Sequence, residues 1–279
     1  QKEIREFFRE KLQHYEALGI FIIAPDYISL ASMRDQNIGT TNLMAIEKRE
    51  LLDKVFSGKS QLIPPVKSDV PLLNQQGEMQ AELPTMFAVS PVRDEEGKVI
   101  AALSVRYDPI KNYDLIQKSA HFGESGETYL FDRNGFLLSN SRYCNVMKEL
   151  GLIDPDKIAA LNFQLLDPEV NLHENSELIN IAVRKNLTYG ISEAVKGKTG
   201  WSIDAYRDYR GVPVLGSWHW FDDFEFGIIS EIEEKEALSV YRHSVMITYI
   251  LMIMIIIFVL VFIWIIMRTK QKSNKALRE

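Results

Sequence analysis

The chain has 279 residues, of which 46% are hydrophobic and 25% are charged, a composition typical of globular proteins that excludes wholesale disorder. The formal net charge is −6, and because residues 268–279 hold five basic residues and one acid, the part before them is strongly acidic, which argues against a nucleic-acid partner. The single cysteine, Cys144, excludes an intrachain disulfide and leaves the redox compartment undecided.

Residues 1–19 are predicted to form a leading helix, because apolar side chains recur there at helical spacing. Ile4, Phe7, Phe8 and Leu12 form this stripe, and we expect it to be the contact of a homodimer. The chain opens within the helical pattern, without a methionine or a signal peptide. Because the topology derived below requires export of the acidic domain, we expect a preceding segment, most simply a first membrane helix.

Three pairs of similar segments indicate that the following region contains the same unit twice. In the first pair, FIIAPDYISLASMR at 21–34 matches YLFDRNGFLLSNSR at 129–142, each with an apolar strand, a turn, a second strand and a terminal arginine. The other two pairs are a helix end with glycine, VFSGKS (55–60) and AVKGKT (194–199), and a closing hairpin, 85–107 and 212–232.

We therefore predict an α+β fold in which a long N-terminal helix precedes two antiparallel-sheet modules with helices laid across them, followed by one transmembrane helix. Each module has the order strand–strand–helix–strand–strand–strand. The second module contains an insertion at 143–190, in which short helices are expected at 145–150 and 155–161. The predicted boundaries are a membrane-distal module at 20–108, a connector at 109–122 and a membrane-proximal module at 123–232.

Residues 245–267 read VMITYILMIMIIIFVLVFIWIIM and carry no charge, which is long enough for a helix to cross a hydrocarbon layer of about 30 Å. Tyr249 and Trp264 lie near its ends, where aromatic rings favour the membrane interface. Basic residues follow the segment, so the positive-inside rule places 1–243 outside and 268–279 in the cytoplasm, as the start of a signalling helix. Residues 233–244 are predicted to form a juxtamembrane helix.

Two consecutive PAS-like sheets after a long helix and before a membrane helix resemble a double Cache (dCache) sensor domain of a bacterial transmembrane receptor. The resemblance covers essentially residues 1–243. It implies a periplasmic ligand-binding domain on the bacterial inner membrane, a ligand that usually sits in the distal module, and an output domain after residue 279. A subgroup fused to histidine kinases of two-component systems or to nucleotide cyclases is most similar in four segments: GETYLFDRNGFLLSNSR (126–142), YRDYRGVPVLGSWHWFDDFEFGIISEIE (206–233), SDVPL (68–72) and SVRYDP (104–109).

The distal candidates for ligand binding are charged, polar and aromatic residues at predicted strand positions, because a buried charged ligand needs partner charges or hydrogen bonds. Family members that sense amino acids have an Arg-x-Trp-Tyr signature, whereas Arg34 is followed here by Asp35 and Gln36, so that mode of binding is in doubt. In the alternative, Arg34 and Arg106 form ion pairs at strand ends and Asp69 caps a turn. The distal candidates are Tyr27, Arg34, Asp69, Phe87, Ser90 and Arg106.

The proximal candidates lie on predicted strands or at their ends, where an arginine fork between aromatic walls would suit a carboxylate. In the alternative, the two tryptophans belong to the core and Arg142 pairs with Asp208 to stabilise the fold. The alternating pattern does not decide between the two, because a sheet covered on both faces does not reveal which face holds a ligand. The proximal candidates are Arg142, Tyr206, Asp208, Arg210, Trp218 and Trp220.

The predicted function is extracytoplasmic sensing of a small molecule, with a carboxylate or similar metabolite favoured, and ligand binding that shifts the last membrane helix. The five histidines are scattered, and no Walker loop, G-x-S-x-G elbow or dinucleotide fingerprint occurs. We therefore expect no cofactor, no metal site and no enzyme activity in this fragment. Two alternatives remain: an ectodomain that binds a periplasmic protein, and, more remotely, a membrane-tethered ectoenzyme.

Overall fold

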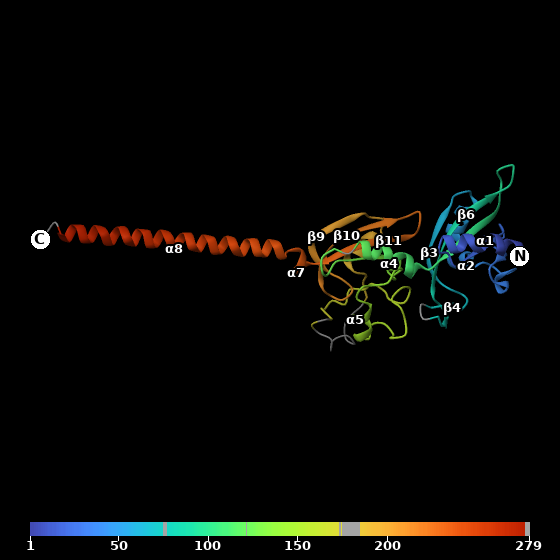
Figure 1. The fold of residues 1–279 in the computed structure, drawn as a ribbon, viewed down its shortest axis with the longest axis horizontal. Coiled ribbons are helices and arrows are strands. Elements are labelled where there is room, and N and C mark those ends of the chain that lie inside the picture. Colours follow the sequence, from blue (N-terminus) through green and yellow to red (C-terminus); the bar gives the residue numbers. More distant parts are fainter. Residues whose placement is uncertain (75–76, 121, 173, 175–184, 277–279) are drawn as a thin grey trace. The chain divides into compact units, whose positions relative to one another are not determined.

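The computed structural model of the chain describes residues 1–74, 77–120, 122–172, 174 and 185–276. These residues form a mixed α+β fold with antiparallel sheets (Figure 1). They divide into two compact units, residues 1–233 and residues 234–279, which are described separately below.

The first sheet has five strands in the order β2-β1-β7-β6-β3, and every neighbouring pair is antiparallel. The edge strand β3 contains Pro64 and Pro65, and its register shifts between Ile63 and Val66, which is tolerated because an edge strand needs only one row of hydrogen bonds. The strands are β1 (Gly19–Ile23), β2 (Ser29–Ser32), β3 (Gln61–Lys67), β6 (Pro84–Arg93) and β7 (Val99–Tyr107).

Helices and a small hairpin accompany this sheet. Helix α3 packs on β3, β6 and β7, and its buried face joins strand residues such as Ile23, Ile63 and Phe87 in one apolar core. None of the residues of α1 is buried. The elements are α1 (Lys2–His14), the short 3-10 helix η1 (Asp35–Asn37), α2 (Leu43–Glu47), α3 (Arg49–Phe56), and the hairpin of β4 (Leu72–Leu73) and β5 (Met79–Gln80).

The second sheet has four strands in the order β8-β11-β10-β9, which repeats the order β1-β7-β6-β3 of the first. Helix α4 (Pro109–Ser119) connects the two sheets and contacts β6 and β8, and α6 covers β9, β10 and β11. The remaining elements are β8 (Glu127–Phe131), α5 (Cys144–Glu149), α6 (Tyr189–Ala194), β9 (Gly200–Arg207), β10 (Pro213–Phe221) and β11 (Phe226–Glu233).

The predicted hairpins are confirmed as β6–β7 and β10–β11. The two glycine-ended helices are confirmed as well, because α3 and α6 end before Gly58 and Gly197, which both have positive φ. The second strand predicted within 129–142 is wrong: only a bridge joins Phe131 and Leu137. There the backbone of Leu137 hydrogen-bonds the later segment instead, with Phe163 as its acceptor (3.0 Å) and Leu161 as its donor (2.7 Å).

Of the two short helices predicted in the insertion, the one at 145–150 is confirmed as α5, and the one at 155–161 is wrong. Residues 155–161 form turns, because the Asp154 carboxylate accepts a hydrogen bond from the N–H of Asp156 (3.1 Å) and Leu161 has a positive φ. The leading helix ends at His14, earlier than predicted, and is followed by Glu16 with positive φ. Part of the insertion, 173 and 175–184, lies outside the described residues.

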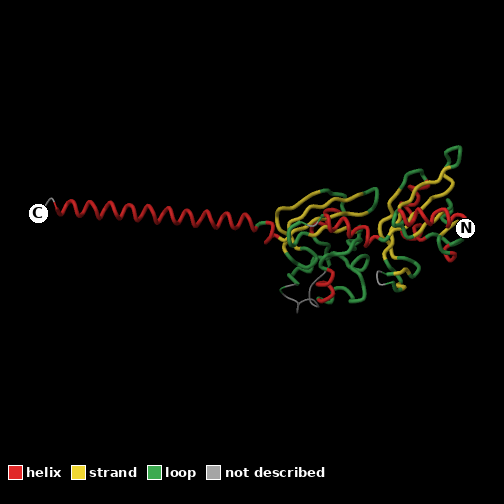
Figure 2. Tube along the Cα trace, viewed as in Figure 1, coloured by secondary structure: helices red, strands yellow, loops and turns green. Residues whose placement is uncertain are grey.

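The second unit is helical. Helix α7 (Glu234–Ala237) precedes α8 (Ser239–Ala276), a helix of 38 residues that runs without a break (Figures 1 and 2). Its segment Tyr241–Lys270 reaches a mean hydropathy of 3.5 and is not buried against protein. This segment contains the predicted span and is long and apolar enough to cross a membrane.

Candidate functional site

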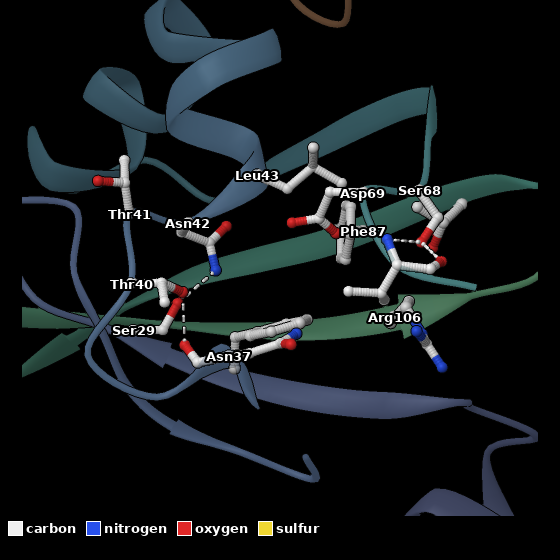
Figure 3. Close-up of a pocket in the computed structure, with 13 residues that line it drawn as sticks. Ser29, Asn37, Thr40, Thr41, Asn42, Leu43, Ser68, Asp69, Phe87 and Arg106 are labelled. Atoms are coloured by element: carbon white, nitrogen blue, oxygen red, sulfur yellow. Dashed lines mark hydrogen bonds between the residues drawn. The ribbon is translucent and has the colours of Figure 1, made fainter. Parts of the chain in front are cut away.

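A polar hollow lies between the first sheet and the two segments that cover it, Asn37–Leu43 and Ser68–Val70 (Figure 3). Strand residues supply the floor, with the ring of Phe87 buried at its centre. Its cavity volume is about 20 Å³. The hollow as it stands therefore holds little more than water, and a larger ligand requires the covering segments to move.

Asn42 fixes the polar wall on the helical side. As the N-cap of α2, it accepts a hydrogen bond from the N–H of Met44 at Oδ1 (3.1 Å), and its Nδ2 donates to Oγ of Ser29 (3.0 Å). Asn42 and Ser29 are both buried, so the pair has one orientation. The asparagine before this apolar helix thus places a side-chain amide at the hollow, next to the Ser29 hydroxyl.

Asp69 brings a carboxylate to the other covering segment. The hydroxyl of Ser68 donates to the carbonyl of Val70 (2.7 Å), which fixes the turn that presents Asp69. Figure 3 shows the Asp69 carboxylate directed toward Asn42 above the ring of Phe87. Because Asp69 is exposed, its charge is available to a molecule entering from solvent.

Thr85 on β6 contributes a hydroxyl to the lining of the hollow. Its Oγ1 is buried and has no hydrogen-bond partner among the described residues. A buried hydroxyl without a partner costs about 1–3 kcal/mol, a cost that a bound polar molecule would remove.

Arg106 on β7 lines the hollow from the opposite end, and in Figure 3 its guanidinium points away from Asn42. Its Nη2 donates weakly to the carbonyl of Leu18 (3.4 Å), while its Nε is buried without a partner. Burial, followed by repulsion from Arg34, lowers the pKa of Arg106 to about 10, and attraction to Asp69 partly offsets this. The guanidinium therefore stays charged at neutral pH.

The distal candidates divide into three groups. Asp69, Phe87 and Arg106 line this hollow, and Arg34 lines a second one beside it, which also includes Arg106. Tyr27 lies outside both linings and donates to the Asp53 carboxylate (2.6 Å). Ser90 is exposed and hydrogen-bonds Ser60 (2.9 Å).

Sequence reasoning missed Ser29, Asn42 and Thr85. Only Asn42 carried a signal, since an asparagine before an apolar helix is a typical N-cap.

The proximal candidates pack in the core or bind other residues of the chain. Trp218 and Trp220 belong to the core cluster of the second sheet. The pair expected between Arg142 and Asp208 is wrong. Asp208 pairs instead with Arg210, at 2.7 Å between Nη2 and Oδ2, because the turn after β9 places Arg210 directly above the carboxylate. Arg142 donates to the carbonyl of Gly126 (2.6 Å).

Two buried glutamates that sequence reasoning missed complete this polar network. Glu127 accepts from the hydroxyl of Tyr209 (2.6 Å). Glu231 accepts from the hydroxyls of Tyr129 (2.6 Å) and Tyr206 (2.8 Å). Burial raises the pKa of both carboxyls. The pKa of Glu231 is raised to about 8, because burial and repulsion from Asp208 outweigh the hydrogen bonds donated by Tyr129 and Tyr206.

The arrangement around Arg210 does not leave its charge free for a ligand. Arg210 also contacts Glu233 (3.3 Å) and lies 3.6 Å from the ring centroid of Tyr143. Burial raises the pKa of Asp208, and the adjacent guanidinium partly offsets this. The positive charge of Arg210, which the sequence suggested for a ligand, is thus balanced by the carboxylates of Asp208 and Glu233.

Among the described residues, no group of three or more histidine, cysteine, aspartate or glutamate side chains is placed to hold a metal ion. No protein-family model matches the chain, and no curated protein matches it by sequence.

Solved structures do resemble it. They are extracellular sensor domains. The ligand-binding domain of the Pseudomonas aeruginosa PAO1 amino acid chemoreceptor PctB, in complex with L-Arg, is 12% identical with a TM-score of 0.48, covering 87% of this chain and 76% of that one. The Vibrio cholerae histidine kinase DctB sensor domain is 10% identical with a TM-score of 0.42, covering 82% and 77%. The periplasmic sensory domain of the Campylobacter jejuni chemoreceptor Tlp1 is 11% identical with a TM-score of 0.39, covering 79% and 73%.

These similar structures are sensor domains of histidine kinases and chemoreceptors, and they cover most of the chain.

Proposed function

We propose that the chain is the sensor and membrane-anchoring part of a bacterial inner-membrane receptor of the dCache type, and that its distal hollow binds a small polar molecule. The observation that carries the proposal is the buried hydroxyl of Thr85, which has no partner among the described residues and faces a hollow shared with Asp69 and Asn42. Polar groups converging on one space are typical of ligand sites.

The repeated strand order supports two PAS-like modules. The first sheet has the order β2-β1-β7-β6-β3, and the second repeats it without an equivalent of β2. In each module, helices lie across the sheet and the last two strands form the closing hairpin. The distal module has the more accessible polar groups, since the buried polar side chains of the proximal module bind one another through an ion pair and hydrogen bonds.

The chemistry of the lining favours a ligand with donor groups near Asp69 and an acidic group near Arg106. The carboxylate of Asp69 and the hydroxyl of Thr85 can both accept hydrogen bonds, and Arg106 is positively charged. A small zwitterion or a polar acid carrying a donor group satisfies both ends. Its binding would stabilise the state in which the two covering segments close on it.

A physical connection leads from the cover of the hollow toward the membrane helix. Lys48 lies between α2 and α3, and its Nζ is 3.2 Å from the carboxylate of Glu225, in the turn before β11. Strand β11 ends at Glu233, and the chain continues directly into α7 and α8. Movement of α2 on ligand binding would therefore pull on the strand that precedes the membrane segment.

A thermal-shift screen of the 279-residue chain in lipid nanodiscs tests the proposal, using amino acids, amines and organic acids. A ligand at 100 times its Kd adds about 2.7 kcal/mol to the free energy of unfolding. Asp69→Asn and Thr85→Val should abolish the shift, whereas Asp204→Asn, an exposed residue on β9, should leave it unchanged. A ligand whose thermal shift is unchanged in both Asp69→Asn and Thr85→Val would show that the site lies elsewhere.

Binding of a periplasmic protein is the second candidate function. Strand β9 is the edge of its sheet and exposes Trp201 and Ile203, which are 69% and 73% exposed. An edge strand with exposed apolar side chains can pair with a strand of another protein. Absence of any small-molecule shift, together with a partner whose binding is lost on Trp201→Ser, would favour this function.

A further inference from the structure

A second, larger hollow lies beside the first and shares Arg106 with it. Its cavity volume is about 370 Å³, which is within the range of small-ligand sites. Apolar and polar side chains line it in similar number, and they come from the first sheet, from the β4–β5 hairpin, from the start of α4 and from the segments on either side of α5. The side chains that matter here are Leu18, Leu72, Ile110 and Ile158, with Arg34 and Arg106.

Among the described residues that line this hollow, the two arginines outnumber the acids, so its net charge is positive. Among the described residues, neither guanidinium has a carboxylate oxygen within 4.0 Å. Arg34 donates to the carbonyl of Pro71 (3.1 Å), and Arg106 has only its weak bond to Leu18. Asp108 is the one acid among the described lining residues, and its carboxylate accepts from the backbone N–H groups of Ile110 (2.9 Å) and Lys111 (3.3 Å).

Two further observations support a polar ligand at this hollow. The Nε of Arg106 and the Oδ1 of Asn140 are buried and have no hydrogen-bond partner among the described residues. Repulsion from Arg34 also contributes to the lowered pKa of Arg106, so an anion placed between the two would relieve that repulsion. Two like charges beside apolar walls are costly unless a counter-charge binds there.

We propose that this hollow is a second binding site, for a small organic anion with an apolar body. Its carboxylate contacts the guanidinium groups of Arg34 and Arg106, which are suited to planar anions, and its body packs against Leu18, Leu72, Ile110 and Ile158. A bare inorganic anion would leave these apolar walls in contact with water. The site is distinct from the hollow beside Asp69, because Arg34 and Ile158 line only the second hollow.

Equilibrium dialysis of the full 279-residue chain in nanodiscs tests this inference, with phenylacetate as the probe and empty nanodiscs to subtract partitioning into lipid. Phenylacetamide and phenethylamine have the same ring without the negative charge. We expect saturable binding of phenylacetate, at least about tenfold weaker binding of the amide, and no saturable binding of the amine. Arg34→Gln should weaken phenylacetate binding about 10-fold to 100-fold.

The matched control is Arg9→Gln, which removes the same charge from an exposed position on α1. If Arg34→Gln does not fold, Ile158→Asp provides the second variant, because a negative charge in the wall should weaken phenylacetate binding as well. The inference would be overturned if phenylacetate binding does not saturate, if phenylacetamide binds equally well, or if the folded variants bind phenylacetate as the wild type does. Equal competition by sulfate would also overturn it, by removing the role of the apolar walls.

This outcome is separable from that of the proposed function. A ligand of the first hollow depends on Asp69 and Thr85, neither of which lines the second. Loss of phenylacetate binding in Arg34→Gln with an intact response to the first ligand would establish two sites.

Discussion

Replacing Glu231 with glutamine should change how the stability of the chain depends on pH. The Glu231 side chain is 4% exposed and lies between the hydroxyls of Tyr129 and Tyr206. Burial, followed by repulsion from Asp208, raises its pKa to about 8 in the folded protein. In the unfolded chain a glutamate has a pKa of about 4.3.

The sign follows from the proton that the folded state keeps. Between about pH 4.3 and pH 8, the folded protein holds a proton on Glu231 that the unfolded chain has released, so the free energy of unfolding falls as the pH rises through this interval. At about 1.4 kcal/mol per pH unit, the whole interval corresponds to at most about 5 kcal/mol. The decline levels off above about pH 8, where both states are ionised.

Glutamine keeps the hydrogen bonds without the charge, because its oxygen can accept from one tyrosine and its amide can donate to the other. We expect Glu231→Gln to match the wild type near about pH 4 and to exceed it by about 2–5 kcal/mol at pH 8. Urea unfolding followed by tryptophan fluorescence measures this, since Trp218 and Trp220 lie in the same core. Glu95→Gln, in the exposed turn between β6 and β7, is the control. A difference between Glu231→Gln and wild type that stays constant with pH would refute the reasoning.

Three other substitutions test separate parts of the structure. Thr85→Val removes a hydroxyl that has no partner among the described residues. In urea unfolding, the free energy of unfolding should therefore stay unchanged or rise by about 1 kcal/mol. A fall of more than about 1 kcal/mol would mean that the hydroxyl makes a hydrogen bond in the folded protein. Gly216→Ala places a methyl group against Oη of Tyr206, and should cost about 1–3 kcal/mol, which the matched Tyr206→Phe, Gly216→Ala double variant partly restores. The pair of Lys48 and Glu225 should show a coupling free energy of about 0.5–1 kcal/mol in a double-mutant cycle, and additive single effects would exclude it.

The parts of the fold that sequence predicted well are those set by neighbouring residues. The hairpin β10–β11 follows from apolar strands on either side of a short polar turn, and the ends of α3 and α6 follow from Gly58 and Gly197. The helix that is long and apolar enough to cross a membrane follows from composition alone. None of these depends on where a distant segment lies.

The misses depend on distant segments. The strand expected at Leu137 is lost because residues 161–163 supply its backbone partners, and no pattern within 129–142 reveals them. Glu127 and Glu231 look like solvent-facing strand residues in the sequence, yet tyrosines far along the chain bury them. Arg210 was predicted to bind a ligand, but its guanidinium pairs with the neighbouring Asp208, so the predicted arginine fork is an internal ion pair.

The unbroken helix α8 has a consequence for how its two ends are related. With 3.6 residues per turn, inserting one residue after Ser239 rotates everything beyond the insertion by about 100° about the helix axis, whereas inserting seven returns the later residues to within about 20° of their original direction. The helix therefore fixes an angular phase between the end of the sensor and whatever follows Ala276. If the proposed receptor transmits rotation through α8, its output should vary with the length of inserted helix with a period of about 3.6 residues.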